Sequence, residues 1–180
     1  MLPRQFKLFL AALLAVTTTP ALADSKAEID ANVQVAIQEF YESSPAGKIL
    51  AQDAAGILVF PKVLKAGIGV GGEYGEGSLL VGGQPAAYYS TASASIGFQF
   101  GAQLKSQVVL FMTQEALDRF RDSDGWEAGV DGSIAIIEFG AAEEISSQSI
   151  QDPIIGFIFS NRGFMYNLTF EGSKLTEIVR

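Results

Sequence analysis

The chain has 180 residues, no cysteine, no histidine and a net charge of −8 at pH 7. This length suffices for one folded domain, and an apolar content of 48% argues against disorder. The missing cysteine and histidine exclude disulfides, thiol nucleophiles and most zinc sites, and the acidic balance argues against nucleic acid as a partner.

The N-terminal segment has the pattern of a secretory signal peptide. Arg4 and Lys7 precede an apolar run, Leu8–Val16, and a small-x-small site ends at Ala23. The run is too short for a membrane span, which needs about 20 apolar residues. We therefore expect cleavage after Ala23 and an exported, periplasmic protein whose residues 24–180 form a single domain. That form has 10 basic residues against 20 acidic ones.

Two helices are predicted next. Ser25 and Glu28 form a capping box at the start of a helix over residues 25–42. Apolar residues at helical spacing form one stripe on it, made of Ile29, Val33, Ala36, Ile37 and Phe40. Ser44 followed by Pro45 predicts a second helix, because serine suits the N-cap and proline the first helical position.

The pattern then changes to a period of two, which is typical of strands. Residues 57–60 are predicted as a short strand that Pro61 ends, and residues 107–112 as a buried strand. Alternation over residues 92–104 predicts an unusually long strand that must bend, most easily at its glycines. The remaining elements are a helix begun by Thr113, a strand over 130–136, a polar loop over 140–152, and strands 153–160 and 164–171 around a turn at 161–163.

These elements predict an α+β fold that is mainly antiparallel β. We expect a bent barrel-like or sandwich sheet system with two N-terminal helices and one inserted helix.

A glycine-rich stretch, FPKVLKAGIGVGGEYGEG, begins at Phe60. Gly67, Gly69 and Gly72 in it spell the G-x-G-x-x-G of dinucleotide-binding loops. That loop requires a helix after its glycines, whereas here acidic residues and a further apolar strand follow. The sequence therefore argues against nucleotide binding.

A steric role explains the glycines better. Gly67, Gly69 and Gly71 are predicted on one face of a strand, with Ile68 and Val70 on the other. Bare backbone lets a helix, a strand or a ligand tail approach closely, and these alternatives remain open.

Catalytic and metal-binding patterns are scarce. Asp122-Ser123-Asp124-Gly125 resembles the start of a calcium loop but lacks the glutamate at its twelfth position. No G-x-S-x-G motif occurs. We expect no enzyme activity, no cofactor and no metal.

Four strings in order resemble the SYLF domain family: ILVFPKVLKAGIGVGGEYGEG, SASIGFQFGAQ, GWEAGVDGSIAI and DPIIGFIFSNRGFMYNLTFEGSKL. The resemblance extends from about residue 27 to residue 178. Eukaryotic members of this family bind phosphoinositides, a yeast branch binds actin, and exported bacterial members exist. The resemblance implies lipid binding by a compact β-rich domain.

In eukaryotic members a basic N-terminal helix contributes to phosphoinositide binding, but here the matching helix has Lys26 as its single cation. The leading hypothesis is therefore a non-enzymatic lipid-binding protein of the bacterial cell envelope that holds an acyl chain against apolar surface. The candidate lipid-binding residues are the apolar stripe together with Lys65, Gly67, Gly69 and Gly71. The alternatives are that the stripe packs on the sheet, and that the protein is an envelope interaction or scaffolding module with a protein partner.

Overall fold

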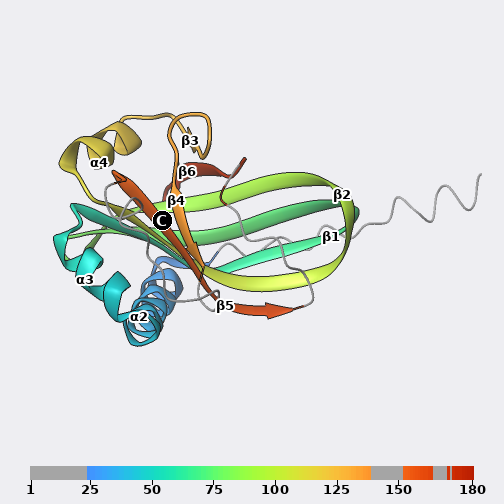
Figure 1. The fold of residues 1–180 in the computed structure, drawn as a ribbon, viewed down its shortest axis with the longest axis horizontal. Helices are drawn as coiled ribbons and strands as arrows, with labels where there is room; N and C mark the ends of the chain where they lie inside the picture. The colour runs from blue at the N-terminus through green and yellow to red at the C-terminus, as the bar shows by residue number, and fades with distance from the viewer. Residues whose placement is uncertain (1–23, 139–151, 164–169, 171) are drawn as a thin grey trace, which may run out of the picture.

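The computed structural model describes residues 24–138, 152–163, 170 and 172–180 (Figure 1). Its helices are α2 (Lys26–Ser43), α3 (Pro45–Asp53) and α4 (Gln114–Arg121). Its strands are β1 (Gly56–Val81), β2 (Gln84–Phe111), β3 (Trp126–Glu127), β4 (Ala135–Glu138), β5 (Ile154–Gly163) and β6 (Lys174–Ile178). The expected leader, residues 1–23, lies outside the described residues.

The strands form one bent sheet that curves into a half-barrel. The strand order is β3-β6-β2-β5-β4, and β1 pairs with β2. All pairings are antiparallel except that of β4 with β5, which is parallel. The predicted α+β class with mainly antiparallel β structure is thus confirmed, as are the two N-terminal helices and the inserted helix.

Local capping signals place the helix starts correctly. The Ser25 hydroxyl accepts a hydrogen bond from the backbone N–H of Glu28, whose carboxylate accepts one from the N–H of Ser25. The Ser44 hydroxyl accepts from the N–H of Gly47 at 2.9 Å and begins α3. Thr113 caps α4 in the same way.

The prediction that Pro61 ends a strand is wrong. β1 continues through it to Val81, with a register shift between Phe60 and Val63. A bulge accommodates the missing proline N–H, because the ladder is already interrupted there.

The predicted strand over 130–136 is also largely wrong. The N–H groups of Val130 and Asp131 donate to the carbonyl of Glu127, and the Asp131 carboxylate accepts from the Glu127 N–H at 2.6 Å. These bonds close a turn, and Gly129 within it has a φ of 88°. Only residues 135–138 of this region form a strand, β4.

The predicted turn at 161–163 is absent, because these residues continue β5 and pair with β2. Gly163 lies opposite Gln103, and Arg162 lies opposite Leu104. Most of the predicted strand 164–171 and of the loop 140–152 lies outside the described residues. The short strand β6 was not predicted; it pairs with β2 at residues 88–92.

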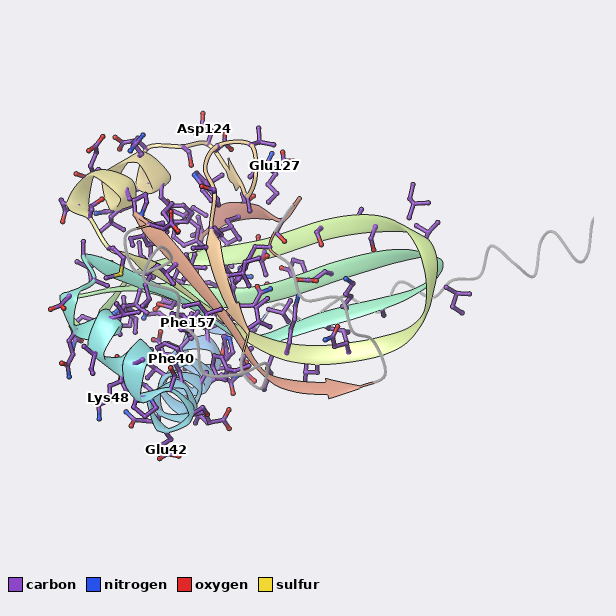
Figure 2. All side chains as sticks on the ribbon, in the orientation of Figure 1. Phe40, Glu42, Lys48, Asp124, Glu127 and Phe157 are labelled. Atoms are coloured by element: carbon purple, nitrogen blue, oxygen red, sulfur yellow. The ribbon has the colours of Figure 1, made fainter. Side chains whose placement is uncertain are left out.

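Hydrophobic core lies on both faces of the sheet. On one face, α2 and α3 cover Val59, Val108, Leu110, Ile155, Phe157 and Phe159. On the other face, Leu58, Phe60, Val109 and Phe111 pack with Leu117 and Phe120 of α4 and with Trp126. Phe40 of α2 and Phe157 of β5 lie against each other in the first layer, with ring centroids 4.8 Å apart (Figure 2). We call this packed part of the molecule the base.

Beyond the base, β1 and β2 extend together as a long arm (Figure 1). We define the arm as residues 62–76 of β1 paired with residues 90–106 of β2. No helix of the described residues is long and apolar enough to cross a membrane.

Candidate lipid-contact site

The apolar stripe of α2 is buried in the base. Its five residues, Ile29, Val33, Ala36, Ile37 and Phe40, are between 0% and 4% exposed. Phe40 lies among Phe157 and Phe159 of β5. The stripe therefore packs on the sheet, which was one of the alternatives that the sequence left open. Lipid could reach it only if α2 left the sheet.

Polar contacts also hold α2 on the sheet. Lys26 forms an ion pair with Asp30 at 2.9 Å and a short hydrogen bond to the Tyr88 hydroxyl. That hydroxyl donates to the Asp30 carboxylate at 2.8 Å. These bonds raise the pKa of Lys26, so the ammonium stays charged at the point where helix and strand meet.

The glycines bend the arm back on itself. A Cβ on Gly67 would clash with the backbone of Val70 and Gly71, and one on Gly75 would lie 2.7 Å from the carbonyl oxygen of Lys62. The two halves of β1 thus face each other as two layers. Gly67 and Gly75 thus allow a close backbone approach, whereas an added Cβ on Gly69 would have no atom within 4 Å; no helix follows the motif.

One detail of the glycine pattern was wrong. Gly67, Gly69 and Gly71 do not share one face, because the register shifts between Ile68 and Val70. Gly69 lies at this shift with a φ of 72°, a conformation that favours glycine. Gly67 and Gly71 remain on the inner side of the bend, whereas Gly69 is exposed at its tip.

The inner side of the arm is polar. Lys65, Glu73 and Lys105 are at most 5% exposed, and Gln107 is fully buried. The Nζ of Lys105 lies 3.0 Å from the Glu73 carboxylate, and the Gln107 amide donates to the same carboxylate at 3.2 Å. Because Glu73 belongs to one layer and Lys105 to the other, the ion pair joins the two layers across the interior.

Burial lowers the pKa of Lys105, and the charge and hydrogen bonding of Glu73 oppose this shift. Removing an ammonium from water is costly, so the carboxylate is what makes the charged form tolerable there. Lys65, one of the candidate lipid-binding residues, is also buried inside the arm.

The outer side of the arm is apolar and exposed. Its large side chains are Leu64, Ile68, Val70, Tyr74, Ile96 and Leu104, with exposed fractions from 40% to 90%. These six are more than half of the eleven large exposed hydrophobic residues in the described part of the chain. Exposed apolar residues gathered in this way mark an interaction surface, whereas isolated ones need no explanation.

These outer residues were not identified as a site from the sequence. The signal that could have found them is the phase of the charges: Lys65, Glu73 and Lys105 all fall in the register opposite to the large apolar residues. Alternate residues of a strand lie on opposite sides, and only one side of each strand faces the interior of the arm. If the charged side chains pair in the interior, the large apolar side chains must lie on the outer side.

A shallow groove lies where the arm meets α2. It has a volume of about 170 Å³ and is lined by Asn32, Val35, Ala36 and Glu39 of α2 and by Pro61, Lys62, Leu104, Lys105 and Ser106. Ligand pockets usually measure about 300–1,000 Å³, so this groove is small for an enclosed lipid tail. It does not lie beside the glycines. The geometry therefore favours contact on an open surface.

Metal binding finds no support in the described residues, which contain no group of three or more potential ligands. Asp122 and Asp124 lie after α4, and Asp122 caps it through its backbone N–H. Asp124 lies near Glu127 at the upper edge of the molecule in the view of Figure 2, away from the arm.

Residues 92–179 match the sequence model of a protein family described as Ysc84, Las17-binding protein actin regulator. This is the SYLF family, so the matched part of the chain, residues 92–179, is similar to a SYLF domain. The match begins inside β2 and includes the later half of the arm, α4 and all later strands. No curated protein matches the chain at a significant level.

Proposed function

We propose that this protein is a non-enzymatic lipid-binding protein of the bacterial cell envelope that binds through apolar surface. The observation that carries the proposal is the inverted arm, with charged and amide side chains inside and large apolar side chains outside. An apolar exterior is unfavourable in water and favourable against hydrocarbon, where burying one valine or isoleucine side chain is worth about 1.5–3 kcal/mol.

The charge of the protein supports the same mode. With 20 acidic residues and no histidine, the chain has no net attraction to anionic headgroups. Similarity to the SYLF family is consistent with binding rather than catalysis. Export is part of the proposal and follows from the signal-peptide pattern before Ala23.

Vesicle flotation tests this function. Protein purified after secretion by a bacterial host, so that the cell does the processing, is mixed with phosphatidylcholine vesicles. The test variant combines Ile68→Ser, Val70→Ser and Ile96→Ser. The control combines Ile49→Ser and Val130→Ser, two residues that are 62% and 72% exposed and lie outside both the arm and the groove.

We expect the native protein and the control to float and the arm variant to lose at least about tenfold in bound fraction, because three apolar anchors are removed. Absence of flotation at every lipid composition would refute lipid binding. If a stoichiometric envelope protein were then captured by the native arm and not by the triple variant, the scaffolding alternative would take its place.

A further inference from the structure

Charged side chains divide the outer surface of the arm into zones. Lys62 is exposed where one layer of the arm joins the base. Where the other layer joins it, Glu76 pairs with Arg180 at 2.6 Å. Between them the outer positions of β1 carry no charge, and the outer positions of β2 carry none from residue 90 to residue 106. A charge-free tip therefore projects from a charged collar.

The length of the apolar zone is comparable to one leaflet. Leu64 to Ile68 and Val70 to Tyr74 each span four residue steps, which is about 13 Å in an extended strand. The hydrocarbon core of a bilayer is about 30 Å thick, so one leaflet contributes about 15 Å. The zone is long enough to enter one leaflet and too short to cross both.

The apolar residues lie on both layers. Leu64 pairs with Leu104 in one layer, and Val70 pairs with Ile96 in the other. Because the layers pack with their polar sides together, these pairs point to opposite sides. A surrounding solvent such as hydrocarbon contacts both sides at once, whereas a single docked protein would cover one.

We propose that the arm enters one membrane leaflet tip first. Ile68, Val70 and Ile96 lie in the acyl region, Tyr74 lies at the headgroup level, and the collar of Lys62 and the Glu76–Arg180 pair stays in water. This inference rests on the lipid-binding function proposed above and names the surface and the depth. Tyrosine suits the headgroup level, because its ring is apolar and its hydroxyl is polar.

The backbone of the arm opposes insertion. Within the described residues β1 pairs only with β2, so one edge of the arm has unpaired N–H and C=O groups. Such groups are costly in hydrocarbon, where no water can bond to them. Because this edge also runs along the inserted residues, it lowers the affinity at every depth, and the length of the apolar zone is what confines insertion to one leaflet.

The mode of insertion requires no basic residue. The cations of the arm other than Lys62, namely Lys65 and Lys105, are buried inside it. Binding is expected to depend on acyl packing and to gain less than twofold when neutral lipid is partly replaced by anionic lipid.

Depth-dependent quenching tests the inference directly. The chain has no native cysteine, so one introduced cysteine is a unique attachment point for a polarity-sensitive dye. The variants are Ile96→Cys at the tip, Lys62→Cys at the collar and, as a control, Ile49→Cys on α3, where the native residue is 62% exposed. The vesicles are phosphatidylcholine that carries quenchers either at the headgroup or within the acyl chain.

We expect the dye at position 96 to be quenched at least about threefold more by acyl quenchers than by headgroup quenchers. The dye at position 62 should show the reverse order, and the dye at position 49 should be quenched by neither. The labelled Lys62→Cys protein, whose substitution lies outside the apolar zone, must still float, which separates labelling damage from a wrong site.

Vesicle binding with an unquenched tip and a quenched α3 would overturn the inference and leave the proposed function standing. No binding of any labelled or unlabelled protein would refute both. A dye signal at position 96 that rises with protein concentration in the absence of lipid would show a second copy on the tip, and this too would overturn the inference.

Discussion

The base and the arm are built by the same two strands, yet the side chains that they bury differ in kind. In the base, Leu58, Phe60 and Phe111 of β1 and β2 are buried and apolar. In the arm, the buried positions hold Glu73 and Lys105. Alternation along a strand tells which residues share a face. Which face becomes the inside depends on what packs against it.

The two regions are therefore expected to contribute differently to stability. Apolar burial stabilises the base, whereas a buried ion pair adds little after its desolvation is counted. The Thr91 hydroxyl in the arm is buried without a hydrogen-bond partner in the described part of the chain, which lowers the contribution of the arm further.

Truncation of Phe40 in the base should cause the largest loss of stability. Its ring is fully buried against Phe157. Phe40→Ala is expected to lower the free energy of unfolding by about 3–5 kcal/mol in urea titrations. Ile96→Ala in the arm, where the side chain is 90% exposed, should change it by less than about 0.5 kcal/mol. Equal losses would mean that the outer side of the arm is packed.

Removing the carboxylate inside the arm should have the next largest effect. Glu73→Leu leaves the Lys105 ammonium buried without its counter-charge, and we expect a loss of about 3 kcal/mol. Adding Lys105→Met should recover most of it, because an apolar pair needs no compensation. A Glu73→Leu protein as stable as the native one would show that Lys105 reaches water.

The same variant should show a distinctive pH dependence. Burial lowers the pKa of Lys105 below its ordinary 10.5, so the folded state binds its proton more weakly than the unfolded state does. Stability then rises with pH between the lowered value and 10.5. This rise should be larger in Glu73→Leu than in the native protein and absent from the double variant.

The close approach of the two layers can be tested with a smaller change. A Cβ on Gly77 would clash with the Val59 carbonyl, so Gly77→Val should cost about 1–3 kcal/mol in thermal unfolding. Gly72→Ala is the matched control, because the nearest atom to its Cβ, the Ser93 carbonyl oxygen, is 3.9 Å away. Native stability in Gly77→Val would contradict the packing of the layers.

The smallest expected effect on stability comes from the ionisation of one tyrosine in each region. Desolvation first, and then a neighbouring carboxylate, raises the pKa of Tyr74 in the arm and of Tyr89 in the base to about 12. Because the raised pKa favours the protonated folded state, stability should fall as pH rises from 10 towards 12. In an alkaline absorbance titration, the Tyr74→Phe and Tyr89→Phe variants should each show one fewer hydroxyl that ionises late.

Added vesicles would sharpen this comparison. If the arm inserts, they should delay ionisation of Tyr74 and leave Tyr89 unchanged. Equal shifts of both hydroxyls would contradict contact through the arm.

The sequence predicts the helices well because their signals are local. Ser25 with Glu28, and Ser44 before Pro45, satisfy backbone groups within one turn. Strand ends depend on distant partners, so they were harder to predict. Pro61 lies within β1 because of a bulge opposite β2, and residues 161–163 stay extended because β2 continues beside them.

The candidate site was only partly predictable for the same reason. The periodicity of α2 identified its apolar stripe, but an apolar stripe looks alike whether it meets a sheet or a lipid. The exposure of Ile68 and Ile96 follows from the folding of the arm, which no short segment encodes.

The tight turn between β1 and β2 sets the alignment of both regions. Gly82 and Gly83 have φ values of 59° and 76°, and Val81 pairs with Gln84 across them. The pairs follow outward from this point, with register shifts after Leu79, Ile68 and Phe60, and one residue inserted without a compensating shift would exchange the two sides of one strand. The lysines and glutamates would then turn towards solvent and the isoleucines would turn inward. The turn at Gly82 and Gly83 therefore helps to determine whether the outer side of the arm is apolar or charged.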